Sequence, residues 1–177
     1  NIKARNIFKS VNYKAVNGTS DDLKIIDIAV EEKPTGEISA GAGFGTEGGV
    51  FAFTVNENNY LGKGNRLGFD FNLSKDSLKG RLNYTNPNYD FLGNSLTYDL
   101  SSATNDKPNQ GYENTITSAS ISTSFEQYKD IYATLGVSGS YDDLQTQGNA
   151  SDSLKKQSGS FSEIAGKYGF RYDKRNR

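Results

Sequence analysis

The chain has 177 residues, a formal net charge of -1, 34% hydrophobic residues and a mean hydropathy of -0.69. Lys and Arg are scattered among Asp and Glu, so there is no basic stripe to neutralise phosphates, which argues against a nucleic-acid partner. His and Cys are absent, which removes most hydrolase and metalloenzyme arrangements, and we expect no cofactor or metal site.

The first 34 residues predict a small α/β element. A helix containing Ile2, Ile7 and Phe8 comes first, followed by a strand from Val11 to Val16, a turn at Asn17-Gly18, and a strand from Leu23 to Glu31. A unit this short has too little core to fold alone, so we interpret it as the second half of a truncated domain. Asn1 and the segment from Asp173 to Arg177 also suggest a chain that is processed or cut at both ends.

From Glu37 onward, apolar residues recur at every second position. In the first such segment Ile38, Ala40, Ala42 and Phe44 alternate with small or polar residues. A tilted strand needs about 9–11 residues to cross a bilayer, and no run approaches the ~20 apolar residues of a membrane helix. We therefore predict an antiparallel transmembrane β-barrel wall with eight strands: Glu37–Gly45, Val50–Asn58, Arg66–Leu73, Leu78–Tyr84, Ser95–Ser101, Thr115–Phe125, Ile131–Tyr141 and Phe161–Tyr172.

The two faces of the predicted sheet differ in polarity. The sixth strand carries a file of serines at Ser118, Ser120, Ser122 and Ser124, which suits a wet lumen. Short connections are expected at 46–47, 74–77 and 126–130, and long ones at 86–94, 102–114 and 142–160. The carboxylates Asp70, Asp99, Glu163 and Asp173 are interpreted as solvated lumen or loop residues, because no neighbouring group in the sequence orients them for acid–base chemistry.

The segment from Gly43 to Gly48 satisfies the G-x-G-x-x-G spacing of dinucleotide sites. Such a site needs a following helix, whereas Gly49 to Phe53 reads as a strand. We therefore predict a hairpin with its turn at Gly48-Gly49. Glycine weakens a strand, so the segment from Glu37 to Gly45 is expected to pair loosely.

Five segments in a fixed order carry a family resemblance. They are Val30–Gly36 (VEEKPTG), Gly43–Gly49 (GFGTEGG), Asn59–Gly64 (NYLGKG), Tyr84–Pro87 (YTNP) and Tyr172–Arg175 (YDKR). Each motif is weak alone, but the ordered set resembles the BamA family, the outer-membrane β-barrel assembly factors of Gram-negative bacteria in the POTRA-plus-barrel superfamily.

The resemblance implies two domains. Residues 1–34 would be the C-terminal part of the last POTRA domain, a helix plus a β-hairpin, and residues 35–177 would be the N-terminal half of the barrel, with the first eight of about sixteen strands. The latter half of the family's barrel, with its Arg-Gly-Phe loop motif and final strand, is missing. Eight strands of such a sheet leave two unpaired edges that lipid cannot satisfy.

The resemblance also implies a function. A family member folds and inserts client barrel proteins through a lateral gate at barrel strand one, where a client strand adds to the edge by β-augmentation. It would not be an enzyme, and its partners would be unfolded outer-membrane proteins, accessory assembly lipoproteins and outer-membrane lipid. It would lie in the outer membrane with its N-terminal part in the periplasm. The expected client-binding edge comprises Glu37, Ile38, Ser39, Ala40, Gly41, Ala42, Gly43, Phe44 and Gly45.

Two other classes of function remain open from the residues. A porin, or a two-partner secretion or translocation-assembly pore of the same superfamily, would use Arg66, Lys79, Arg81 and Lys167 on its inner face to tune passage. The predicted N-terminal hairpin argues against a porin. A soluble ligand-binding barrel of lipocalin type would turn its apolar face inward, and the serine file and the glycine-rich first strand argue against it.

Overall fold

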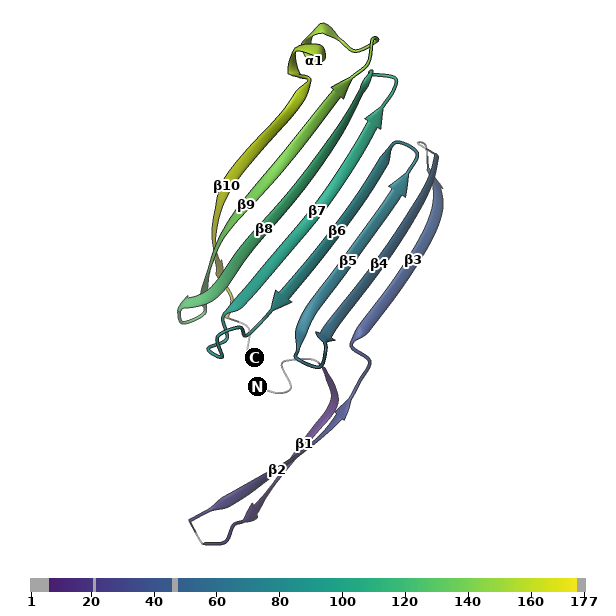
Figure 1. The fold of residues 1–177 in the computed structure, drawn as a ribbon. Coiled ribbons are helices and arrows are strands. Elements are labelled where there is room, and N and C mark those ends of the chain that lie inside the picture. The colour runs from purple at the N-terminus through teal and green to yellow at the C-terminus, as the bar shows by residue number, and fades with distance from the viewer. Residues whose placement is uncertain (1–6, 21, 46–47, 175–177) are drawn as a thin grey trace.

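The computed structural model describes residues 7–20, 22–45 and 48–174. These residues form a two-stranded hairpin and one large, curved antiparallel sheet (Figure 1). The hairpin extends from one rim of the sheet, which we call the hairpin-side rim, and the opposite rim is called the far rim. The sheet is open, because its first and last strands do not pair with each other.

The hairpin consists of β1 (Phe8–Asn17) and β2 (Lys24–Glu32), paired antiparallel from Phe8 opposite Glu32 to Asn17 opposite Lys24. Phe8 therefore begins a strand, and its placement in a helix was wrong. Ile2 of the predicted helix lies outside the described residues. The turn predicted at Asn17-Gly18 begins where β1 ends, and the connection to β2 is closed by the Gly18 amide, which donates to the Leu23 carbonyl across 2.8 Å.

The large sheet contains the eight strands predicted after Glu37, each paired with its neighbours in chain order. Period-2 alternation located them correctly because it depends on each strand's own residues. They are β3 (Gly36–Gly45), β4 (Gly48–Tyr60), β5 (Asn65–Ser74), β6 (Ser77–Asn86), β7 (Ser95–Lys107), β8 (Tyr112–Tyr128), β9 (Ile131–Thr146) and β10 (Gly159–Tyr172).

The last four strands extend beyond their apolar segments, which corrects three predicted connections, including the one expected at 126–130, because β8 continues to Tyr128. The residues from Ser102 to Asn114 are mostly strand around a four-residue turn, and β9 continues to Thr146. These extensions are polar, and cross-strand hydroxyl pairs such as Thr104 with Thr115, at 2.9 Å, join them. A six-residue helix, α1 (Asp152–Gln157), follows β9. It was missed because it is too short to show helical periodicity.

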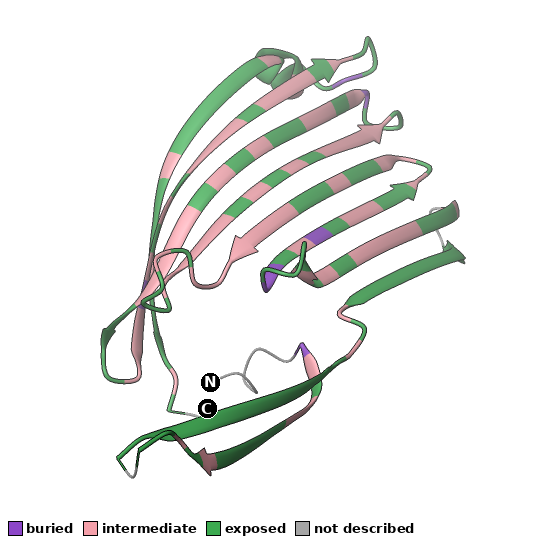
Figure 2. Ribbon diagram, turned by 60° about the horizontal axis from the view of Figure 1, so that its bottom comes forward, coloured by how far each residue is buried: buried purple, intermediate pink, exposed green. Residues whose placement is uncertain are grey.

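The sheet has almost no enclosed core. Among the described residues the buried ones are few, namely Ile7, Gly64, Asn65, Gly68, Gly111, Ala133 and Ala150, and most strand positions are exposed or half-buried (Figure 2). Large apolar side chains on one side of every strand of the large sheet lack protein cover. Within the described ranges, no helix is long and apolar enough to cross a membrane.

Candidate functional site

Registered rows of residues across the sheet give it two chemically distinct faces. One row contains only apolar residues and glycine, and the side defined by it is called the apolar face: Ile38, Val55, Phe69, Leu82, Leu100, Ala119, Gly139 and Ile164. The next residue on each strand points to the opposite side, and that row is entirely polar. It defines the polar face: Ser39, Thr54, Asp70, Arg81, Ser101, Ser118, Ser140 and Glu163.

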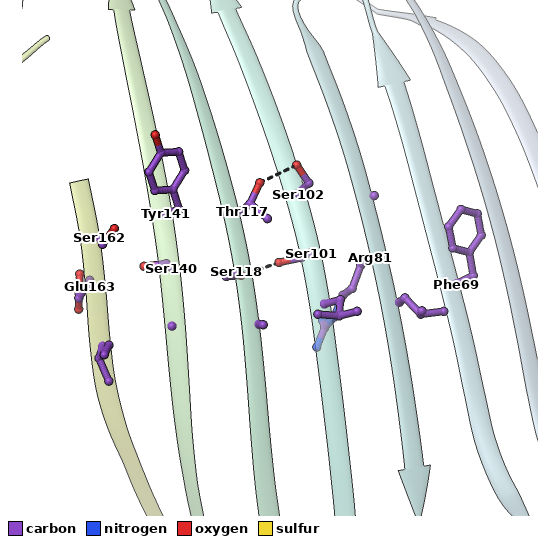
Figure 3. A pocket seen from close by; sticks show the side chains of 16 residues that line it. Phe69, Arg81, Ser101, Ser102, Thr117, Ser118, Ser140, Tyr141, Ser162 and Glu163 are labelled. Atoms are coloured by element: carbon purple, nitrogen blue, oxygen red, sulfur yellow. Dashed lines mark hydrogen bonds between the residues drawn. The ribbon is translucent and has the colours of Figure 1, made fainter. Parts of the chain in front are cut away.

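Hydrogen bonds link neighbouring strands along the polar face. The Thr54 hydroxyl donates to Asp70 across 3.0 Å, and the Arg81 guanidinium donates to Asp99 across 2.6 Å. The hydroxyls of Ser101 and Ser118 are 2.7 Å apart (Figure 3). Polar groups thus satisfy one another on a surface that water can also reach. Such a face is typical of a barrel lumen.

The apolar side chains drift along the strands from one edge of the sheet to the other. On β4 the apolar side chains centre on Phe53, and the residue of β10 in the same registered row is Ser162. The apolar side chains of β10, from Ile164 to Tyr172, instead centre on Tyr168. The drift is therefore six residues over six strand steps. Each strand rises about 3.3 Å per residue, and neighbouring strands lie about 4.8 Å apart. If the apolar side chains form a band parallel to a membrane plane, the strands are therefore tilted by about 35° from the membrane normal.

A level apolar band crossed by strands at this tilt is the geometry of a transmembrane barrel wall, where strands tilt by about 35–45°. A level apolar band is what a lipid-facing barrel surface requires.

The predicted client-binding residues Glu37 to Gly45 all lie on β3, the first strand of the sheet. One edge of β3 pairs with β4 from Gly36 opposite Glu57 to Gly45 opposite Gly48, and the other edge has no strand partner among the described residues. All ten residues of β3 are exposed, including Phe44 at 96%. Whether this edge binds clients remains a prediction.

The two ends of β3 are held differently. At the hairpin-side end, the backbone amide and the side-chain amide of Asn58 both donate to the Thr35 carbonyl, each across 3.1 Å. Towards the far rim, Gly41, Gly43 and Gly45 supply no side chain, and a Cβ at any of them would meet nothing within 4 Å. The far-rim half of β3 is thus joined to β4 chiefly by backbone hydrogen bonds.

The last strand, β10, forms the second open edge. It pairs only with β9, from Gly159 opposite Leu144 to Tyr172 opposite Ile131. Its apolar-face side chains are large and exposed, with Ile164 at 83% and Tyr168 at 80%. Glycine is less frequent here, with three glycines among the fourteen residues of β10 against four among the ten of β3.

The glycine motif and the carboxylates singled out in the sequence do not form a binding or catalytic site among the described residues. Gly43 and Gly45 lie in β3 and Gly48 begins β4, so the G-x-G-x-x-G segment belongs to a hairpin without a helix, and the dinucleotide interpretation is wrong. Gly48 and Gly49 are strand residues of β4, so the turn predicted at these two glycines is wrong, and residues 46–47 lie outside the described residues. Asp70, Asp99 and Glu163 lie on separate strands of the polar face, whereas Asp173 follows β10. No group of His, Cys, Asp or Glu in the described part of the chain could hold a metal ion.

Comparison with known families decides the class of protein. The model of the Omp85 superfamily domain matches residues 59–177. The chain belongs to the Omp85 superfamily. This membership places it among β-barrel proteins of that family and leaves a soluble lipocalin-type barrel without support.

Individual relatives agree with the family. The chain is 29% identical over 133 residues to the outer membrane protein assembly factor BamA of Neisseria meningitidis serogroup B, a match that covers 73% of this chain and 15% of that protein. The crystal structure of Haemophilus ducreyi BamA lacking POTRA domains 1–3 is similar in fold, with a TM-score of 0.72 at 21% identity, over 99% of this chain and 37% of that one. The chain thus resembles a fragment of BamA and spans a minor part of either relative.

Proposed function

We propose that this chain is part of an Omp85 assembly factor that folds and inserts β-barrel proteins into the bacterial outer membrane. In this proposal β3 forms one side of a lateral gate. A client strand adds to its open edge by main-chain hydrogen bonding. The observation that carries the proposal is an exposed edge strand at the end of a two-faced sheet.

The energy for this function comes from pairing and burial. A strand entering the membrane must satisfy its backbone groups, each of which costs several kcal/mol if left unpaired in hydrocarbon. The free edge of β3 offers those partners at the level of the apolar band. Ile38, Ala40, Ala42 and Phe44 would continue the client's lipid-facing row. In this proposal no covalent bond is made or broken, so the function needs no catalytic residue or cofactor.

The glycines of β3 suit a gate that must exchange partners. A strand that packed firmly would resist the entry and release of a client, whereas Gly41 and Gly43 leave the far-rim half weakly packed. The hydrogen bonds between Asn58 and Thr35 hold the hairpin-side end of β3 to β4. We therefore expect the gate to open from the far rim.

The remaining placements belong to the same proposal. Residues 1–34 would be the end of the last POTRA domain, on the periplasmic side with the hairpin, and residues 35–177 the N-terminal half of the barrel. The partners would be unfolded outer-membrane proteins, accessory assembly lipoproteins and outer-membrane lipid. The far rim would face the cell exterior.

Disulfide trapping in the full-length parent protein tests the proposal. Ala40→Cys and Ala42→Cys are each combined with a client that is arrested during assembly and carries a cysteine in its last strand. Residues directly opposite in a sheet have Cβ atoms about 4.5–5.5 Å apart, so disulfides should form there. Leu135→Cys and Val137→Cys are matched controls on the same face of β9. An engaged client without enrichment at β3 would instead favour a secretion or translocation pore of the superfamily.

A further inference from the structure

The apolar face carries a trough that the proposed function does not use. Three adjoining pockets of about 700, 550 and 370 Å³ are all lined by β7, β8 and β9, and the first also extends across the sheet from Phe69 on β5 to Ile164 on β10. The first and second share Leu100, Ala119, Gly139 and Ile164, and the second and third share Ile121 and Val137. We call this continuous depression the apolar trough. Figure 3 shows its far-rim end.

Differences in side-chain size create the trough. Its floor lies at Ala119 and Gly139, where the all-apolar row has its smallest members. Leu100 and Ile164 stand in the same row on either side of them. A smooth barrel wall would carry larger residues at both floor positions.

The trough has the length of a lipid chain. It runs along β8 from Thr117 to Thr123, six residues that span about 20 Å at the usual rise of about 3.3 Å per residue. One leaflet contributes about 15 Å to a hydrocarbon core of about 30 Å. The three pockets succeed one another along β8, so a chain lying through all of them would be tilted from the membrane normal as the strands are.

Hydroxyl groups are more numerous at the far-rim end of the trough than along the rest of it. The far-rim end carries hydroxyls, from Ser102, Thr117, Tyr141 and Ser162. The Ser102 and Thr117 hydroxyls are hydrogen-bonded to each other across 3.1 Å. The Tyr141 and Ser162 hydroxyls, in contrast, have no hydrogen-bond partner among the described residues. Below them the apolar-face lining is apolar apart from Tyr98 and Thr123, and the buried Thr123 hydroxyl has no hydrogen-bond partner among the described residues. No charged side chain points from the apolar face into this end, because Arg81 and Glu163 belong to the polar-face row.

We propose that the apolar trough binds one acyl chain of a membrane lipid, with the lipid's ester region at Tyr141 and Ser162. The inference rests on the proposed placement of the apolar face in the membrane. Its chemistry matches an amphiphile: hydrocarbon meets the apolar floor, and neutral donors meet ester carbonyls. The hydroxyls lie where the apolar side chains of β7 and β8 end, at Leu100 and Ala119, which is the level expected for ester groups.

Filling the trough tests the proposal. Gly139→Leu places a side chain on the floor, where a Cβ would contact only the Glu163 carbonyl oxygen at 3.9 Å. Gly166→Leu is the control, because it lies on the same face of β10 outside the three pockets and also meets nothing within 4 Å. Native mass spectrometry of the full-length parent with phosphatidylethanolamine would count retained lipid. We expect Gly139→Leu to weaken retention of one lipid about tenfold and Gly166→Leu to leave it unchanged.

Equal retention by the three proteins would overturn the proposal. Should Gly139→Leu fail to fold, the wild-type protein provides a second test through a phosphatidylethanolamine with a photoreactive diazirine in its acyl chain. Cross-links should concentrate on residues from Thr117 to Thr123, and an even spread over the apolar face would overturn the proposal. Client disulfides at Ala40 and Ala42 are scored separately, so failure of the lipid site and failure of the assembly function give different results.

Discussion

Ile38 on β3 and Ile164 on β10 stand in one registered row, at opposite edges of the eight-stranded sheet and on the same face. The six positions between them are apolar residues or glycine. An unbroken row of this kind is stable only if another apolar medium covers it. In the proposed function that medium is lipid.

The two-faced wall predicts opposite effects for a charge placed at neighbouring positions of β9. Val137→Lys puts an ammonium group on the apolar face, and Ser138→Lys puts one on the polar face. We expect the first to destabilise the full-length barrel in lipid vesicles by about 2–4 kcal/mol and the second by less than about 1 kcal/mol. Urea unfolding of each variant measures both values. Equal costs would contradict the assignment of faces.

Stiffening β3 should slow client engagement. Gly41 lies in extended backbone and has open space around it, so Gly41→Val introduces no clash. The greater strand preference of valine should stabilise β3 by up to about 1 kcal/mol. Hydrogen exchange of the β3 amides should slow, and client disulfides at Ala40 should form more slowly. Gly136→Val is a contrasting variant, because its Cβ would lie 2.8 Å from the Ser122 Cβ and should destabilise the sheet. Faster exchange in Gly41→Val would refute the packing argument.

The loop after β6 should keep its order in mild acid. Reduced hydration acts to raise the pKa of Asp90, but hydrogen bonds from the Asn94 side chain and the Leu92 amide outweigh it, so this pKa lies below its ordinary value of 3.8. A depressed carboxyl pKa stabilises the folded loop above that ordinary value, and the contribution is lost as the pH falls through the folded pKa. NMR titration of the Leu92 amide should show a midpoint below 3.8, which Asp90→Asn should abolish. A midpoint above 3.8 would be inconsistent with these hydrogen bonds.

The ion pair between Arg81 and Asp99 should contribute little to stability. The two side chains are 57% and 26% exposed on the polar face, where water screens their attraction. A double-mutant cycle with Arg81→Met and Asp99→Asn should give a coupling of about 0.2–1 kcal/mol. A coupling well above that range would show that the polar face excludes water, against its assignment as a lumen.

The sequence predicted the strands but not their registered rows. Alternation within a segment such as Ile38 to Phe44 is local, so it reveals a strand without its partners. The drift from Phe53 to Tyr168 and the depression at Ala119 and Gly139 exist only once pairing is known. Polar strand ends such as Ser102 to Lys107 were missed because their stability comes from cross-strand hydroxyl pairs rather than from apolar alternation.

A proline scan of β3 tests the central claim, that its open edge pairs with client strands. Along an antiparallel strand the amides point alternately to either neighbour, so one set of alternating positions from Ile38 to Gly43 directs its amides away from β4. Proline lacks an amide and is tolerated at such edge positions. Thermal stability of the full-length parent and its client-assembly rate would be measured for each variant.

We expect proline at one alternating set to lower assembly at least tenfold while leaving thermal stability unchanged, and proline at the other set to lower both. Assembly that is unaffected by every proline that leaves the barrel stable would contradict the assignment of the β3 edge.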